Sequence, residues 1–244
     1  PLRLVGSEMC IRDSLKEERD ALVLAANPFV IKLFYAFSSA RHVYFVTEYA
    51  NGGDLYSLLK QLGSLEESMA RKYASEVVLA LEYVHSVGVT HRDLKPDNLL
   101  ISSDGHLKLA DFGLSFVGAS RDDNIIPKAS NEKSPHHRSG SISSDALSSE
   151  KKMAVGTPDY LAPEVLLCET DEISQSVDWW SLGIIVFEML SGVPPFHAPT
   201  PADIFDNILA GYDAHNVVVT YPEDISDEAK AVSYTHLTLP TKRI

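Results

Sequence analysis

The chain contains little cysteine, no long apolar run and no excess of positive charge. Its 244 residues include two cysteines, which excludes a disulfide framework and favours a reducing compartment. The longest apolar run, from Leu182 to Leu190, contains Glu188 and is too short to span a bilayer. The formal net charge of -13 argues against a generic nucleic-acid binder and suits a basic peptide partner. We therefore expect an intracellular protein, cytoplasmic, nuclear or both, with no secretory signal and no membrane span.

Both ends of the chain lack helix or strand periodicity. Residues 1–14 and 232–244 resemble translated sequencing-adapter sequence. The second segment is expected to interrupt a helix, because the capping sequence Ser226-Asp227-Glu228-Ala229 has no amphipathic continuation. We therefore exclude both ends from the fold prediction and expect genuine sequence from 15 to 231.

A charged loop, His91-Arg92-Asp93-Leu94-Lys95-Pro96-Asp97-Asn98, separates two apolar patterns. Before it, residues 66–86 have apolar side chains at helical spacing, and after it residues 99–110 indicate two short strands around an Asp-Gly turn. A buried helix and hairpin can hold Asp93 and Asn98 in one rigid turn. A solvated surface turn is the alternative for a lone Asp-x-x-x-x-Asn. The full order of eight residues disfavours that alternative, because it is the catalytic-loop pattern of protein kinases.

Further segments show a recognisable period or composition. A helix is predicted at 15–26, strands at 31–37 and 42–49, a short helix at 54–60, and a buried central helix at 176–191. Residues 119–152 are rich in Ser, Asp, Lys and His, which predicts a disordered insertion.

Three more motifs follow the charged loop: Asp111-Phe112-Gly113, the segment from Gly156 to Glu164, and the segment from Asp178 to Gly183. In this order, the four motifs resemble the C-terminal lobe of a eukaryotic Ser/Thr protein kinase. Within that family the resemblance is to the AGC group, in its branch of microtubule-associated Ser/Thr kinases, Greatwall and plant IRE-like kinases. Segments that point to this branch are Glu18-Arg19-Asp20, Asn27-Pro28-Phe29-Val30, 154–161 and Ile204-Phe205-Asp206-Asn207-Ile208.

The resemblance implies an α+β, bilobal protein-kinase fold. Residues 15–50 would form a partial N-lobe and hinge, with a remnant sheet and one helix. Residues 51–231 would form a mainly helical C-lobe, in which the insertion at 119–152 belongs to the activation segment. The implied reaction transfers the γ-phosphate of ATP, with Mg²⁺, to Ser or Thr of protein substrates. The oligomeric state is left open.

The resemblance also implies a role for each matching residue, because phosphoryl transfer depends on positioning and charge neutralisation. Asp93 would accept or orient the substrate hydroxyl proton, Lys95 would lie against the γ-phosphate, and Thr157 would contact both. Oxygen atoms of Asn98 and Asp111 would bind Mg²⁺. Nucleotide-binding positions are Thr47 as gatekeeper, the backbone of Glu48 and Ala50, Leu100 as floor, and Glu18, which pairs with a lysine in the family. Carboxylates that would pair with basic substrate residues are Asp54, Asp97 and Glu188. Structural positions are Arg92, Phe112, Gly113, Glu164 and Asp178, where Asp178 is either a loop cap or a plain helix N-cap.

Two departures from the family pattern bear on activity. The glycine-rich phosphate loop and the lysine partner of Glu18 should precede Leu15, where adapter-like sequence stands, so this fragment is expected to be weakly active or inactive. Met153 stands where many AGC kinases carry a phosphorylated Thr. Either no phosphate is needed there, or a serine of the insertion takes over and its phosphate pairs with Arg92. The candidate serines are Ser141, Ser143, Ser148 and Ser149, and for any single one of them the favoured alternative is an unmodified position in a Ser-rich linker. The alternative function is a pseudokinase or scaffold module without phosphotransfer.

Overall fold

The computed structural model describes residues 18–23, 27–39, 42–117, 158–167, 174–213, 221–223 and 225–238. Residues 18–23 are helical. The remaining elements are β1 (Leu33–Ser38), β2 (Val43–Thr47), α2 (Leu55–Leu62), α3 (Glu67–Ser86), β3 (Val89–Thr90), η1 (Pro96–Asn98), β4 (Leu99–Ile101), β5 (Leu107–Leu109), β6 (Phe116–Val117), η2 (Pro158–Tyr160), α5 (Pro163–Leu166), α6 (Ser176–Ser191), α7 (Pro201–Asp213) and α8 (Asp227–Thr238). The predicted insertion at 119–152, Met153 and Thr157 lie outside the described residues.

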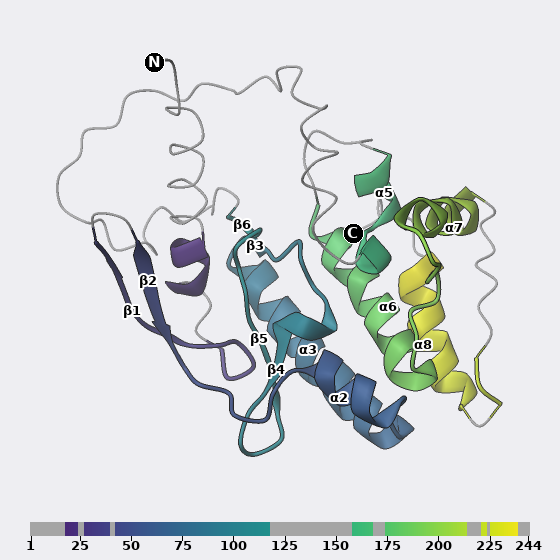
Figure 1. The fold of residues 1–244 in the computed structure, drawn as a ribbon, viewed down its shortest axis with the longest axis horizontal. Coiled ribbons are helices and arrows are strands. Elements are labelled where there is room, and N and C mark those ends of the chain that lie inside the picture. The colour runs from purple at the N-terminus through teal and green to yellow at the C-terminus, as the bar shows by residue number, and fades with distance from the viewer. Residues whose placement is uncertain are drawn as a thin grey trace.

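The described part combines small antiparallel sheets with a mostly helical region. β1 pairs with β2, β3 with β6, and β4 with β5. The β1–β2 sheet and the helical stretch 18–23 lie on one side, and α6, α7 and α8 lie on the other (Figure 1). The hairpin β4–β5 and helix α3 lie between them, so the two motifs that adjoin this hairpin lie between the sheet and the helical side.

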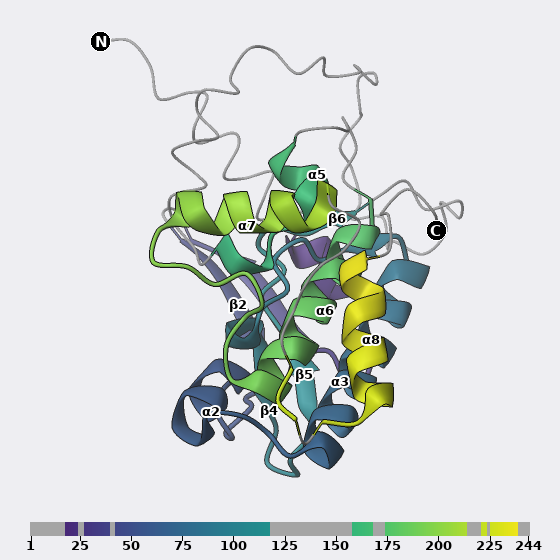
Figure 2. The same ribbon diagram turned by 90° about the vertical axis from the view of Figure 1, so that its right-hand side faces the viewer.

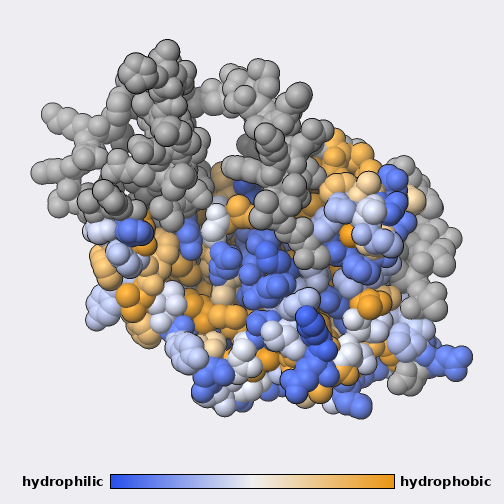
Figure 3. Space-filling view, viewed as in Figure 1, coloured by the Kyte–Doolittle hydropathy of each residue, from blue (hydrophilic) through white to orange (hydrophobic). Residues whose placement is uncertain are grey.

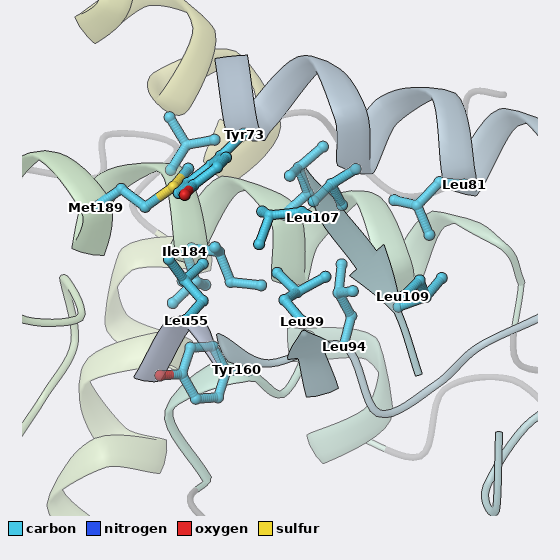
Figure 4. Packing of buried hydrophobic residues seen from close by; sticks show 14 of the residues in the cluster. Leu55, Tyr73, Leu81, Leu94, Leu99, Leu107, Leu109, Tyr160, Ile184 and Met189 are labelled. Carbon is cyan, nitrogen blue, oxygen red and sulfur yellow. The ribbon is translucent and has the colours of Figure 1, made fainter. Parts of the chain in front are cut away.

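The main core forms where α3 and α6 meet the hairpin β4–β5. Leucines from several elements pack together beneath the charged loop (Figure 4). The fully buried leucines include Leu55, Leu81, Leu94, Leu99, Leu107 and Leu109. Burial of this apolar surface is the main force that holds the loop's two flanking elements together. The predicted helix at 66–86 and the predicted hairpin strands are confirmed.

Helix α6 is buried nearly all round, as its sequence predicts, and it spans the predicted residues. It ends at Gly192, whose φ of 87° lies in the left-handed region that favours glycine. A Cβ at this position would lie 2.7 Å from the carbonyl oxygen of Gly63, the residue that ends α2. The close approach of these two helix ends requires glycine at position 192.

Helix α8 corrects the expectation that the helix begun near Ser226 is interrupted. The helix continues to Thr238 and lies along α6 (Figure 2). Ala229, Ser233 and Leu237 recur every four residues, and this stripe of small and apolar side chains faces the core. Ser233 is fully buried and donates from Oγ to the carbonyl oxygen of Gly183 at 3.3 Å. The adapter origin proposed for 232–244 stays a prediction.

The predicted strands at 31–37 and 42–49 are present but shorter. Val30 and Ile31 are buried beside β5, where the amide of Ile31 donates to the carbonyl oxygen of Leu109 at 2.9 Å. This pairing places β1's start at Leu33. The β1–β2 sheet exposes many apolar side chains, and the surface over it is largely hydrophobic (Figure 3). Within the described ranges, no helix is both long and apolar enough to cross a membrane.

Candidate active site

The charged loop is fixed from below by a buried carboxylate of α6. Asp178 accepts hydrogen bonds from the backbone amides of His91 at 2.9 Å and Arg92 at 2.8 Å. Its Oδ2 also accepts from Nε2 of His85, on α3, at 2.7 Å. Gln175 occupies the N-cap position of α6. Asp178 is therefore the cap of the charged loop, and of the two alternatives left open by the sequence the plain N-cap is wrong.

Asp93, Lys95 and Asn98 meet within this loop. Nζ of Lys95 lies 2.7 Å from Oδ2 of Asp93. Nδ2 of Asn98 donates to the carbonyl oxygen of Asp93 at 2.8 Å and to its Oδ2 at 3.1 Å. Both Asp93 and Lys95 keep about a quarter of their side chains exposed, at 27% and 23%. The loop thus holds a carboxylate and an ammonium group in fixed positions that solvent and a substrate can reach.

Asp111 lies beside this loop because the residue before it, Ala110, is hydrogen-bonded to the loop. The amide of Ala110 donates to the carbonyl oxygen of Asn98 at 2.9 Å, which joins the two motifs directly. Asp111 has a φ of 62° and is exposed, and its Oδ1 accepts from the amide of Gly113 at 3.2 Å. Asn98 and Asp111 therefore offer an amide oxygen and a carboxylate on neighbouring segments.

Phe112 anchors the Asp111 segment in the core. Phe112 is fully buried, and its ring centroid lies 4.9 Å from that of His91. His91 is also fully buried and donates from Nε2 to the carbonyl oxygen of Ala110 at 3.0 Å. Leu22 is buried in the same cluster and Leu33 packs against it. Leu22, Leu33 and Phe112 thus belong to one core, which His91 joins through its contact with Phe112.

Glu18 is brought close to Asp111 by the helical stretch at 18–23. Burial raises the pKa of the Glu18 carboxyl, and the negative charge of Asp111 raises it further. Among the described residues, no basic side chain forms an ion pair with Glu18. Glu18 is therefore an acidic group at the edge of the site that the described part of the chain does not neutralise.

The predicted nucleotide-binding positions lie at the end of β2 and in β4. Thr47 pairs with Leu33, and the amide of Glu48 donates to the carbonyl oxygen of Lys32 at 2.8 Å. The Glu48 carboxylate binds Nζ of Lys108 at 2.9 Å. This ion pair ties the segment containing Ala50 to the hairpin β4–β5, to which Leu100 belongs.

The three predicted peptide-binding carboxylates have different surroundings. Asp54 is the N-cap of α2 and accepts from the amide of Ser57 at 2.7 Å, so it has a structural role. Asp97 is exposed on η1. Glu188 is 5% exposed and accepts from Oη of Tyr160 at 2.7 Å.

Burial, aided by the nearby charges of Asp159 and Asp97 and opposed by the Tyr160 hydrogen bond, raises the pKa of Glu188 to about 7. Asp159 is 1% exposed, and its Oδ1 accepts from Nδ1 of His197 at 2.9 Å. The structure thus groups Asp97, Asp159 and Glu188 in one acidic cluster. Asp159 and Tyr160 belong to a motif that the sequence shows, whereas no sequence signal points to His197.

The remaining observations concern Glu164, a predicted structural position, and the predicted Mg²⁺ site. Glu164 is buried in α5 and accepts from Oγ of Ser176 at 3.4 Å. Within the described ranges there is no group of three or more His, Cys, Asp or Glu side chains that could hold a metal ion alone. Asn98 and Asp111 nonetheless fit Mg²⁺, because this ion commonly takes one or two protein oxygens and completes its shell with phosphates and water.

Comparison with known proteins identifies the family. A model of the protein kinase domain matches residues 5–243. "Probable serine/threonine protein kinase IREH1" of Arabidopsis thaliana is 50% identical over 234 residues, which cover 93% of this chain and 17% of the relative. "Rho-associated protein kinase 1" of Homo sapiens is 39% identical over 226 residues, covering 91% of this chain and 14% of the relative. "Serine/threonine-protein kinase CBK1" of Debaryomyces hansenii is 36% identical over 259 residues, covering 91% and 35%.

The fold and the site define a protein kinase domain, and the prediction of this enzyme class is confirmed. The chain belongs to the protein kinase family, and the relatives it resembles are named as serine/threonine or Rho-associated kinases. It spans 14% to 35% of the length of the three relatives described.

Proposed function

We propose that the protein transfers the γ-phosphate of ATP, with Mg²⁺, to Ser or Thr residues of protein substrates. The observation that carries this proposal is the joined pair of motifs, in which the Ala110 amide bonds the Asn98 carbonyl oxygen and sets Asp111 beside the Asp93 loop. Phosphoryl transfer needs little covalent chemistry from the protein and depends on such positioning. Four polar side chains are held in this way: Asp93, Lys95, Asn98 and Asp111.

Each of these side chains has a distinct task in the proposed reaction. The Asp93 carboxylate orients the attacking Ser or Thr hydroxyl and accepts its proton. Lys95, held 2.7 Å from Asp93, supplies positive charge where the transferring group carries negative charge. Asn98 and Asp111 would hold the Mg²⁺ ion, which would supply positive charge against the phosphates. Asn98 also fixes Asp93 through its two hydrogen bonds.

The acidic cluster supports a preference for substrates with Arg or Lys near the phosphoacceptor. Asp97, Asp159 and Glu188 lie close enough that the first two raise the pKa of the third. A guanidinium group would offset this repulsion and make charge-assisted hydrogen bonds with the carboxylates. The same preference is consistent with the proposed place in the AGC group.

Activity of the chain as given is a separate proposal. Glu18 has no cationic partner among the described residues, and its raised pKa reflects that environment. The site should need a cation that pairs with Glu18 and neutralises phosphate charge, and we propose that without one the chain is weakly active or inactive. The same observation favours the second candidate, a pseudokinase that binds partners without phosphotransfer.

One experiment separates these possibilities. Mg²⁺-dependent phosphorylation of a Ser peptide with upstream arginines is measured for this chain and for the chain extended upstream, with Asp93→Ala as the inactive control. Activity of the extended chain alone, abolished by Asp93→Ala, supports a kinase whose described part is incomplete. ATP binding without phosphate transfer supports the pseudokinase. Equal rates on peptides with alanine in place of arginine would contradict the basic preference.

A further inference from the structure

A small sheet joins the two loops that carry the acidic residues of the site. β3 precedes the Asp93 loop and β6 follows the Asp111 loop, with Val89 paired to Val117 and Thr90 to Phe116. Two residue pairs form a minimal ribbon, and an isolated two-stranded ribbon is only marginally stable. Side-chain contacts across this ribbon therefore add to the Ala110–Asn98 hydrogen bond in fixing the two loops relative to each other.

One such contact joins Arg92 to Phe116. Cζ of the Arg92 guanidinium lies 4.5 Å from the centroid of the Phe116 ring, within the range of a cation–π interaction. Arg92 directly precedes Asp93 and has a φ of 68°, a left-handed conformation that an L-residue adopts only when its surroundings impose it. Its amide is held by Asp178 at 2.8 Å. The Phe116 ring holds the other end of the same residue.

The geometry points to Phe116 as a positioning residue for the proposed phosphoryl transfer. Its aromatic face holds the Arg92 guanidinium, and this contact maintains the left-handed turn that presents Asp93 beside the Asp111 segment. Phe116 touches neither reacting group and acts through Arg92. If Phe116 were only an ordinary apolar residue on the exposed edge of β6, its size alone would matter, and leucine would replace it without loss of activity. The inference rests on the proposed function because its effect is on catalysis.

The kinetic test is made in whichever of the two chains compared above transfers phosphate. Phe116→Leu is expected to lower kcat about three- to tenfold, in the range of a cation–π contact, with KM for ATP unchanged. Phe116→Tyr, which keeps the aromatic face, should restore kcat to within about twofold of the original. Phe37→Leu, the same change at an exposed aromatic on β1, is the matched control and should leave kcat unchanged. Equal kcat for the Leu variant and the original protein, or no rescue by Tyr, overturns the inference.

A double-mutant comparison tests whether Phe116 acts through Arg92. In an Arg92→Met background the cation is absent, so Phe116→Leu should have no further effect on kcat or on stability to urea. An undiminished effect in that background would show that Phe116 has only a packing role. The Nε–H proton resonance of Arg92 gives a readout independent of activity, because the Phe116 ring current should shift it upfield and Phe116→Leu should remove that shift. If no chain transfers phosphate, the proposed function fails, and an unshifted Arg92 resonance is the separate result that rejects the contact.

Discussion

Replacing Glu188 by glutamine is expected to stabilise the protein at pH 8 and to have little effect at pH 5. Glu188 is buried, and its pKa rises from an ordinary 4.5 to about 7 in the folded chain. Between these values the folded state binds a proton that the unfolded state has released. The free energy of unfolding therefore falls as pH rises through this window, which is the sign expected for an acid whose pKa folding raises.

The magnitude follows from the size of the pKa difference. A difference of this size corresponds to roughly 3 kcal/mol of destabilisation once the pH exceeds the folded pKa. Glutamine has nearly the same shape, and its Oε1 can still accept from the Tyr160 hydroxyl, so the substitution mainly removes the charge. The stability gained by Glu188→Gln should thus grow by roughly 2.5 kcal/mol between pH 5 and pH 8, because a small part of the effect is already present at pH 5.

Urea unfolding of the original protein and the Glu188→Gln variant at matched pH values from 5 to 8 measures this difference. All other titrating groups are common to both proteins and largely cancel. Glu82→Gln, the same substitution at an exposed position of α3, is the control and should change stability by less than about 0.5 kcal/mol. A stability difference between the original protein and the Glu188→Gln variant that stays constant with pH, or that shrinks as pH rises, would refute the reasoning.

Two further substitutions test the supports of the site and of the core. Asp178→Ala removes the acceptor of the His91 and Arg92 amides and should lower the free energy of unfolding by about 3 kcal/mol and kcat at least tenfold; near-normal kinetics would contradict the capping role. Gly192→Ala places a Cβ 2.7 Å from a carbonyl oxygen at a left-handed φ, so it should lower the free energy of unfolding by about 2 kcal/mol or more. Gly105→Ala, at φ 77° in open space, is the control and should lower it by only about 1 kcal/mol. Thermal or urea unfolding measures both.

The elements with strong apolar periodicity were predictable, and those set by tertiary pairing were not. The long helices α3 and α6 and the hairpin β4–β5 follow from residue spacing alone. Ile31 was predicted to begin the strand beside β2, but together with Val30 it pairs with Leu109 of β5 instead. α8 was expected to stop because its contact stripe consists partly of small residues, such as Ala229 and Ser233, that carry little hydrophobic signal.

The candidate site also has a part that the sequence predicts and a part that depends on tertiary contacts. The motif residues were found because phosphoryl transfer needs specific polar side chains at fixed spacing. What the sequence did not show is how burial changes these groups. The donation from His85 to Asp178, the pairing of His197 with Asp159 and the raised pKa of Glu188 all depend on residues far apart in the chain that folding brings into contact.

In the proposed function, burial of Glu188 would also link substrate charge to pH. Ionisation of Glu188 beside Asp159 and Asp97 is unfavourable in the folded protein, and a bound arginine would make it favourable. By linkage, a peptide that lowers the pKa of Glu188 must release a proton when it binds below about pH 7, and its affinity must rise with pH through that range. A peptide without basic residues has no such coupling. The acidic cluster therefore destabilises the peptide-free fold. In the proposed function, a basic substrate would relieve this destabilisation when it binds, and a substrate without basic residues would not.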